Sequence, residues 1–503
     1  MYSRNAFQID SRDGDAAENA AAGGAAAGGD VCSDPLCNAA EHAAEGAARR
    51  AFALQTRRDF LRAGAVTVGA AALAQFLPPW LRAAPRNARA ATAKSVIQIF
   101  LSGGPSHLDT FDPKPAAGAD FTGPWRKAIG TNVDGVLVNE LFPLTARHAD
   151  KFSLLRGMRH NNNGHETATY MMQTGTLTGG DIVYPAVGAV VARKLEEQGA
   201  LKDRLLPPYI TVPGALGRFS EAGFLGPKYR TFVPGGLAEA PSDAERRRLE
   251  TRAALLADLD ALGASEKAFF EEDDFFRDQA REMVLGKSRA AFDISRETEQ
   301  TRELYGNTGV GRACLQARRL VEHGVAYVTV NMGGWDTHRN QADTYKRTAP
   351  ALDRALAALL ADLAQRGLLA STIVTCGGEF GRTPRFQMAP PWNGGRNHFG
   401  AAFSWLIAGG GFAGGQIVGE TDETGARVIT RPIAPGDLTG SIYRALGIDP
   451  NGVLPHPLGH DVPVVPPQTA PARSGGGGGR GGSGGAGDAS PPKLNLLTEI
   501  MKA

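Results

Sequence analysis

The chain has 503 residues, of which 54 are basic, 52 are acidic and 42% are hydrophobic, and its net charge is +2 at pH 7. This near balance excludes the strongly basic surface on which nucleic-acid binding depends. The length predicts one large folded domain with extensions at its two ends.

The first 90 residues are expected to lie outside the folded domain. Residues 1–55 are rich in Ala, Gly and Asp, a composition typical of disorder. Arg57 and Arg58 then precede an apolar run of about 15 residues, too short to span a bilayer, in a pattern that resembles a twin-arginine export signal. A cleavage pattern ends at Ala90. We therefore expect export by the twin-arginine translocase, a periplasmic or secreted location and no permanent membrane span; the alternative is an Ala-rich helix that merely contains two arginines.

Residues 91–466 predict an α/β domain with a mostly parallel sheet. Continuous apolar runs, typical of strands covered on both faces, occupy residues 95–101, 152–155, 208–213, 325–332, 371–378 and 401–409. Amphipathic stretches between them predict helices at residues 185–199, 310–324 and 349–367. This alternation indicates a doubly wound sheet. Charge-rich residues 241–291 contain no strand pattern and predict a helical insertion.

The cysteines and the C-terminus give further expectations. Cys314 and Cys376 lie in apolar contexts, so we expect buried free thiols rather than a disulfide. Residues 467–492 predict a flexible Gly-rich linker. The tail at residues 493–503 is either a small amphipathic helix that docks on the domain or a partner, or a frayed end.

Polar clusters stand at the ends of four predicted strands, where ligands gather in open α/β sheets. In chain order they are Ser102, Ser106, His107 and Asp109; Asp336 and His338; Glu379 and Arg382; and His398. Their Asp, Glu and His side chains are the types that bind Zn²⁺, Mn²⁺ or Fe.

The segment GGWDTHRN suggests how one such ion is held. In an extended segment, residues i and i+2 point to the same side, so Asp336 and His338 are predicted to bind one ion together. The alternative is that Asp336 caps the next helix and His338 is an ordinary loop histidine.

A second segment, NNNGHETATYMMQTG at residues 161–175, reads as a loop that runs into a helix. The first amides of such a helix form an anion site suited to an ester oxygen, and His165 and Thr167 stand there. The alternative is a core helix with His165 in its exposed first turn.

Several motifs together resemble a bacterial family catalogued as domain of unknown function 1501. They are GGPSHLDTFDPKP, GGWDTH, GGEFGRTP and GRNHF, in that order. One level up, the family is similar to the alkaline phosphatase and sulfatase superfamily. This resemblance implies an α/β/α sandwich that uses one or two metal ions to hydrolyse phosphate or sulfate esters.

The resemblance also implies roles for individual residues. Asp336, His338 and His398 match the ligands of one metal position, and Glu379 matches the first member of a later acidic pair. Three positions depart from the pattern of the second metal and the nucleophile. Ser102 replaces an acid, Phe380 replaces a histidine, and His165 stands where a nucleophile is expected, nine residues before Thr174.

Four explanations of these departures stay open. His107, Asp109 and His165 rebuild a second metal position, or the protein holds one ion and activates water directly. His165 could also attack as a nucleophile. Finally, the scaffold could have lost hydrolysis and now bind a glycan or a partner.

The leading hypothesis is an exported metal-dependent hydrolase of phosphate or sulfate esters, whose substrate is an anionic small-molecule or glycan ester. Asp336, His338, His398, Glu379, His107 and Asp109 are the predicted metal ligands. Arg382 is predicted to pair with an anionic substrate group, and His165 and Thr167 to stand at the point of attack. The rival hypothesis is a non-catalytic binding or assembly protein of the cell envelope.

Overall fold

The computed structural model describes residues 90–176, 182–201, 206–235, 241–262, 279–466 and 494–502. These residues belong to a compact unit that spans Asn87–Ala503. The predicted twin-arginine motif at Arg57 and Arg58 and the predicted linker at residues 467–492 lie outside the described residues. Within the described ranges, no helix has the length and apolarity that a membrane span requires.

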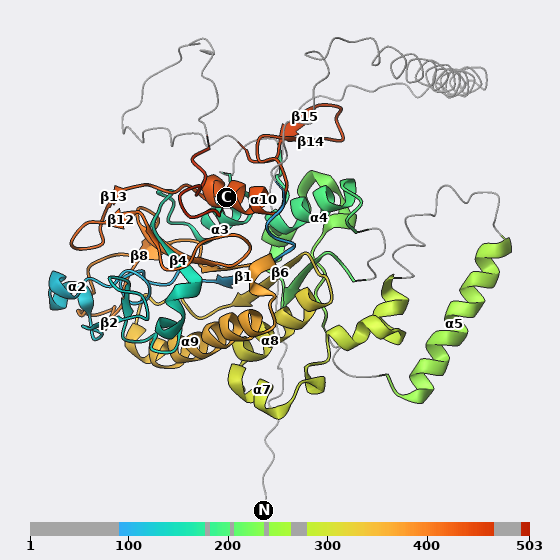
Figure 1. The fold of residues 1–503 in the computed structure, drawn as a ribbon, viewed down its shortest axis with the longest axis horizontal. Helices are drawn as coiled ribbons and strands as arrows, with labels where there is room; N and C mark the ends of the chain where they lie inside the picture. Colours follow the sequence, from blue (N-terminus) through green and yellow to red (C-terminus); the bar gives the residue numbers. More distant parts are fainter. Residues whose placement is uncertain are drawn as a thin grey trace, which may run out of the picture. The chain divides into compact units, whose positions relative to one another are not determined.

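A seven-stranded sheet organises the unit, in the order β11-β4-β10-β7-β1-β6-β5 (Figure 1). Its strands are β1 Ser95–Leu101, β4 Phe152–Met158, β5 Tyr209–Val212, β6 Tyr327–Met332, β7 Thr372–Gly377, β10 Phe403–Ala408 and β11 Ile417–Val418. β1 is parallel to β6 and β7, β5 to β6, and β11 to β4. β10 alone among these runs antiparallel to its neighbours, β4 and β7. The predicted α/β fold with a mostly parallel sheet is confirmed.

All six predicted strands are present, but β4 extends three residues beyond the predicted end at Leu155. Arg156 and Gly157 interrupt the apolar run, which is why the sequence suggested an earlier end. In the structure, a Cβ on Gly157 would lie 2.2 Å from the Arg431 carbonyl oxygen. The glycine is therefore required by a neighbouring backbone and does not end the strand.

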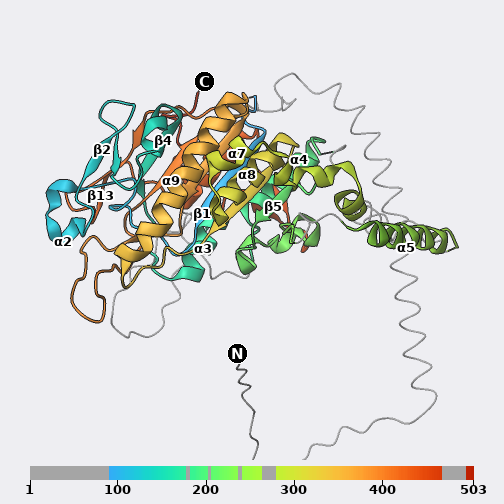
Figure 2. The ribbon, with the colours of Figure 1, turned by 90° about the horizontal axis from the view of Figure 1, so that it is seen from below.

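Helices cover both faces of the sheet (Figures 1 and 2). α8 Gly309–Glu322 and α9 Gln341–Gln365 pack on one face, and α4 Val187–Glu197 and α10 Pro435–Ala445 on the other. α9 begins eight residues before the predicted start at residue 349 and includes Pro350. Helix-breaking propensity at this proline is outweighed by the packing of α9 against the sheet and α8.

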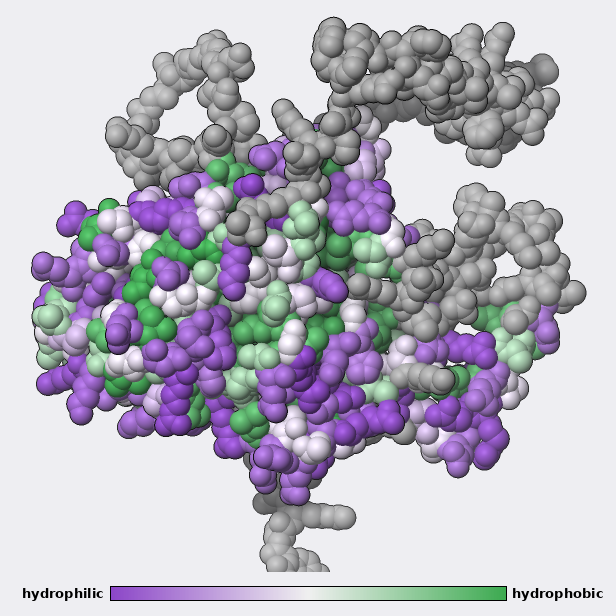
Figure 3. Space-filling model, viewed as in Figure 1, coloured by the Kyte–Doolittle hydropathy of each residue, from purple (hydrophilic) through white to green (hydrophobic). Residues whose placement is uncertain are grey.

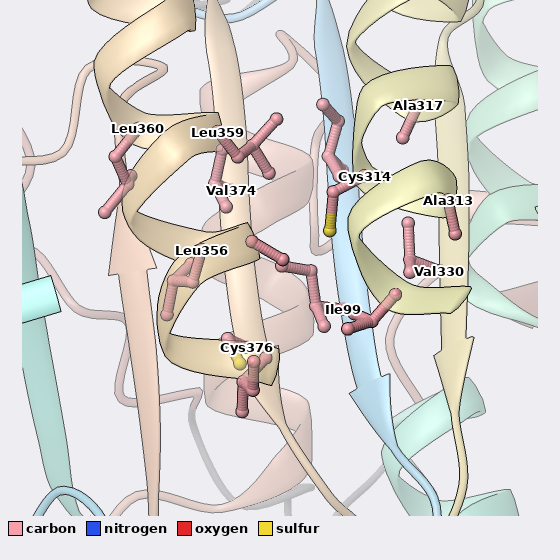
Figure 4. Packing of buried hydrophobic residues seen from close by; sticks show 14 of the residues in the cluster. Ile99, Ala313, Cys314, Ala317, Val330, Leu356, Leu359, Leu360, Val374 and Cys376 are labelled. Carbon is pink, nitrogen blue, oxygen red and sulfur yellow. The ribbon is translucent and has the colours of Figure 1, made fainter. Parts of the chain in front are cut away.

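Alternate residues of each strand enter two separate cores, which explains the continuous apolar runs. In β1, Ile97 and Ile99 join the core under α8 and α9, whereas Val96 and Phe100 join the core on the other face. Figure 4 shows the first core, with Cys314 on α8 and Cys376 on β7. Both cysteines are buried free thiols, as predicted, and burial raises the pKa of Cys314 to about 12.

The predicted insertion contains α5 Asp243–Leu262 and further helical residues at 279–285, and no strand occurs in its described part. Residues 494–502 of the tail pack back on the domain in an extended and turn conformation, so the docked alternative holds but the helix does not. The face drawn in Figure 3 is mainly hydrophilic with scattered hydrophobic residues, as expected when the apolar side chains lie in the two cores.

Candidate metal centre

Five strands deliver polar side chains to one edge of the sheet. β1, β4, β6 and β7 end at this edge, and β10 begins there because it runs antiparallel. Residues that follow the first four strands therefore meet residues that precede β10. This explains why Asp336 and Glu379 follow their strands whereas His398 precedes its own.

Asp336 lies among three histidines at this edge. Its Oδ1 atom is 3.1 Å from His338 Nε2 and 3.2 Å from His398 Nε2, and its Oδ2 atom is 3.4 Å from His165 Nε2. The Nε2 atoms of His338 and His398 are 2.8 Å apart. We call Asp336, His165, His338 and His398 the Asp336 cluster.

Each histidine of the cluster uses its other ring nitrogen, Nδ1, to donate a hydrogen bond to an oxygen. The acceptors are Glu379 Oε1 for His165 at 2.7 Å, Asn397 Oδ1 for His338 at 3.0 Å and the Asn163 carbonyl for His398 at 2.8 Å. With the proton held on Nδ1, each neutral ring presents a lone pair on Nε2. Two such lone pairs 2.8 Å apart repel, so the arrangement calls for a proton or a cation between them.

The donor atoms fit a single divalent ion. Ligands about 2.0–2.1 Å from a tetrahedral Zn²⁺ lie roughly 3.3 Å from one another. The separations among Asp336 Oδ1, His338 Nε2 and His398 Nε2 range from 2.8 to 3.2 Å. The donor atoms of His165, Asp336 and His398 all lie within 4.8 Å of one another. Three imidazoles and one carboxylate form a set that suits Zn²⁺ or Fe.

Charges around the cluster keep Asp336 ionised. Partial burial acts to raise the pKa of Asp336, but the hydrogen bond and charge of Arg382 hold that pKa at about 2. The hydrogen bond that His165 donates to Glu379 raises the pKa of His165, whereas burial lowers the pKa of His398. A stable carboxylate at the centre of three imidazoles favours cation binding.

Two glycines after β1 let the backbone pass close to the cluster. A Cβ on Gly103, whose φ is +113°, would lie 2.3 Å from the Asp336 backbone nitrogen. The Gly103 N–H donates to both carboxylate oxygens of Glu379, at 2.9 and 3.1 Å. A Cβ on Gly104 would lie 2.4 Å from the Phe380 ring. Both positions need glycine because of this close approach.

Phe380 fills the place where the resemblance implied a histidine of a second metal. Its ring is fully buried and lies 5.1 Å from the His165 ring and 4.6 Å from the His398 ring, between centroids. An aromatic ring offers no ligand atom. Within the described ranges, only the Asp336 cluster, through His165, Asp336 and His398, brings the ligand atoms of three or more Asp, Glu, His or Cys residues close enough to share an ion.

Arg382 does not have the predicted role. Its side chain is fully buried and donates to the carbonyl oxygens of Gly103, Gly104 and Arg396 and to Asp336 Oδ1, the last at 2.6 Å. A guanidinium engaged by four acceptors and closed off from solvent cannot pair with a substrate. Arg382 instead orients Asp336.

His107 and Asp109 lie outside the cluster, which corrects their prediction as metal ligands. Asp109 is fully buried, with its Oδ2 atom 2.8 Å from Arg396 Nε and 2.6 Å from Gln341 Nε2. His107 donates from Nε2 to the Gly425 carbonyl at 2.8 Å, and burial lowers its pKa. Both side chains hold loops together.

Glu379 and Thr167 also take roles other than those predicted. Glu379 is buried, and its carboxylate contacts the Gly103 amide and His165 Nδ1. It therefore orients His165 and is not itself in the group of ligand atoms. The Thr167 hydroxyl donates to Asn162 Oδ1 at 2.7 Å, and no contact joins it to the cluster in the described residues.

Two sequence alternatives can be settled. α9 begins after Asn340, which carries no side-chain cap, so Asp336 is not the cap of the following helix. His165 is the first residue of α3 His165–Thr174, and its side chain is 38% exposed, but it also belongs to the cluster.

Sequence reasoning missed Asn163 and Asn397, which accept from His398 and His338. Both stand in segments already noted, NNNGHE and GRNHF: Asn163 lies two residues before His165, and Asn397 directly precedes His398. The signal in the sequence was an asparagine close to a candidate ligand histidine, because a ligand histidine usually donates its other ring N–H to an oxygen. Trp392 was also missed; its ring centroid lies 6.2 Å from that of His338.

Comparison with known proteins agrees with the motif analysis. The sequence profile of the family described as "Protein of unknown function (DUF1501)" matches residues 93–471, and no curated protein matches the chain. Matching solved structures include the lipoteichoic acid synthase LtaP from Listeria monocytogenes, at 11% identity over 72% of this chain and 73% of that chain, with a TM-score of 0.32.

Two further matches come from other bacteria. A protein in the alkaline phosphatase superfamily from Vibrio parahaemolyticus is 10% identical over 72% of this chain and 68% of that chain, with a TM-score of 0.34. The C-terminal periplasmic domain of EcEptC from Escherichia coli, in complex with Zn, is 10% identical over 77% of this chain and 89% of that chain, with a TM-score of 0.35.

Proposed function

The chain belongs to the DUF1501 family, and from this premise we propose that it is an exported, metal-dependent hydrolase of phosphate or sulfate esters. The convergence of three Nε2 atoms on Asp336, each with its Nδ1 proton held by an oxygen, carries the proposal. The Nε2 atoms of His338 and His398, 2.8 Å apart, need a proton or a cation between them, and the ionised Asp336 beside them favours a cation.

Asp336, His338 and His398 would hold one ion, with His165 as the fourth ligand. When bound, the ion supplies a Lewis acid that stabilises negative charge on ester oxygens. Arg382 keeps Asp336 ionised, and Glu379 keeps the His165 lone pair on Nε2. The exposed fractions of the four side chains, from 20% to 48%, leave the cluster open to a substrate.

His165 cannot be a ligand and a nucleophile at once, because both roles use Nε2. Its Nε2 atom is 3.4 Å from Asp336 Oδ2, and its ring centroid is 4.2 Å from that of His398. These contacts support the ligand role. We therefore propose hydrolysis by direct attack of water rather than through a covalent histidine intermediate.

The test is metal analysis followed by a substrate panel. Protein purified after export should contain about one Zn or Fe per chain. Aryl phosphate, phosphodiester and sulfate substrates are then compared in the wild type, in His338→Ala and in His323→Ala, where His323 is an exposed residue at the end of α8. We expect His338→Ala alone to lose both metal and turnover. Equal turnover by all three proteins would contradict the assignment of the Asp336 cluster as the catalytic site.

One observation favours the rival function, a non-catalytic binding or assembly protein. Arg382 contacts the cluster, but its guanidinium donates to buried acceptors of the protein and cannot bind a substrate anion. A metal then serves to fix the loops of the sheet edge. This alternative expects stoichiometric metal without turnover of any substrate, together with a loss of thermal stability on chelation.

The proposed export has its own test. Replacing Arg57 and Arg58 by lysine removes the paired guanidinium groups that the translocase recognises. We expect the full-length double variant to stay in the cytoplasm, whereas the wild type reaches the periplasm or the medium. Fractionation and immunoblotting measure the distribution, and unchanged export of the variant would contradict the proposal.

A further inference from the structure

The tail at residues 494–502 packs on a part of the domain that lies more than 50 positions earlier in the chain. We call these nine residues the clasp. They contact the turn after β10 at residues 409–413, Arg431 and α10, which together we call the clasp groove. The groove lies inside the segment matched by the family profile, residues 93–471, and the clasp lies outside it.

Apolar side chains at a spacing of three anchor the clasp. Leu497 and Ile500 are 0% and 2% exposed, and both belong to the core beneath α10, against which Leu494 also packs. Gly440 of α10 provides the space, because a Cβ at this position would lie 2.8 Å from the Leu496 side chain and 3.4 Å from that of Leu494. A fully buried leucine contributes roughly 1.5–3 kcal/mol.

The groove also recognises the backbone of the clasp. Asp437 Oδ1 accepts from the Asn495 amide at 2.7 Å, and Ser441 Oγ accepts from the Leu497 amide at 2.9 Å. Arg431 Nη2 donates to the carbonyl oxygens of Asn495 and Leu496, both at 3.0 Å. The groove therefore supplies both donors and acceptors to the backbone of the clasp, as sites that bind extended peptides do.

Hydrogen bonds to the turn after β10 complete the seat. The Ala413 amide donates to the Ile500 carbonyl, and the Lys502 amide donates to the Gly411 carbonyl, both at 2.7 Å. Arg431 Nε lies 2.7 Å from Glu499 Oε1 and adds an ion pair. Both ends and the middle of the clasp are thus bonded to the domain.

We infer that the clasp groove is a peptide-binding site, and that its ligand is the chain's own C-terminal peptide with the pattern Leu-x-x-Leu-x-x-Ile. All the contacts that hold the clasp are non-covalent, so the binding does not depend on chain continuity. The covalent connection of the clasp to the rest of the chain raises its local concentration to the order of mM. The inference is independent of the metal centre.

The test separates the clasp from the domain after folding. A specific protease site is placed within residues 473–483 of the full-length protein, and the protein is cleaved. We expect the C-terminal fragment to stay bound through gel filtration. Leu497→Asp should weaken this binding at least tenfold, whereas Thr498→Asp, an exposed neighbour with the same added charge, should change it less than twofold.

A second measurement leaves the tail sequence of the protein unaltered. A synthetic peptide KLNLLTEIMKA should displace a fluorescently labelled copy from the cleaved protein, and the peptide with Leu497→Asp should not. Release of the fragment on cleavage, or equal competition by the two peptides, would overturn the inference. A dimer that is lost in Leu497→Asp would assign the groove to the tail of a neighbouring copy and would overturn the intramolecular assignment.

Discussion

Two groups of charged side chains at the same edge of the sheet differ in how their polar atoms are paired. Asp109 and Arg396 form a fully buried pair, whose carboxylate is also bonded to Gln341. In the Asp336 cluster, by contrast, Nε2 atoms face one another and a half-exposed carboxylate. Both acids stand in Gly-rich motifs after a strand. An acidic residue at the end of a strand is therefore not necessarily a metal ligand. A metal site also needs donor atoms that are unpaired and accessible.

Removing one proposed metal ligand is the strongest test of the difference between the two groups. His398→Ala should reduce bound metal from about one ion per chain to below about 0.1, because a site with one imidazole fewer loses much of its affinity. Elemental analysis of purified protein measures the metal, and circular dichroism checks that the fold persists. His107→Ala is the matched control, since His107 lies outside the Asp336 cluster. Equal metal loss in both variants would contradict the assignment.

The opposite result is expected at the buried pair. Asp109→Ala leaves the Arg396 guanidinium buried without its carboxylate, which should lower the free energy of unfolding by about 3–5 kcal/mol. Urea denaturation measures the change. Asp120→Ala breaks an exposed pair with Arg385 and should cost less than about 1 kcal/mol. If the two variants are equally stable, Asp109 is not a structural residue.

The sequence predicted the strands and the ligand types for a physical reason. Strands buried on both faces need continuous apolar runs, and the turns that follow them must meet at one edge. Asp336, His338 and His398 were therefore found from position and chemistry alone. That Asp336 and His338 act together was predicted from their spacing, and that His398 joins them was an expectation from the resemblance. In the structure the donor atoms of the three side chains lie within 3.2 Å of one another.

The pairing of charges could not be predicted, because it joins residues far apart in the chain. Arg396 is 287 positions from Asp109, and Arg382 is 46 positions from Asp336. The sequence does not show that both guanidinium groups donate their hydrogen bonds to buried oxygens of the protein. The docked clasp is hidden in the same way, since its anchors meet α10 only in the folded chain.

The pH dependence of stability tests a further histidine at this edge, His160. Burial, opposed by a hydrogen bond to the Glu379 carbonyl, lowers the pKa of His160 to about 4. Between pH 6.5 and 4 the unfolded chain takes up a proton that the folded protein refuses, so stability falls as the pH falls. The wild type should lose about 3 kcal/mol more than His160→Gln over this range.

Urea unfolding at several pH values measures this difference, and replacement of the exposed His323 by glutamine gives the control. The control should follow the wild type. If His160→Gln loses as much stability in acid as the wild type, burial does not keep the His160 side chain neutral. The polar groups at this edge would then be more accessible to water than the buried Asp109 suggests.

The smallest effect, and the one that sharpens the comparison most, concerns a side chain that belongs to neither group. Glu379 is buried like Asp109, but it acts on the cluster through His165 Nδ1 at 2.7 Å. Glu379→Gln should weaken metal binding about 10–100-fold, because it removes the charge that makes His165 basic. Glu420→Gln, at an exposed position, should have no effect. In a His165→Ala background, Glu379→Gln should change the metal affinity no further, since its partner is gone. An undiminished effect in that background would show that Glu379 acts on the fold, as Asp109 does, and not through His165.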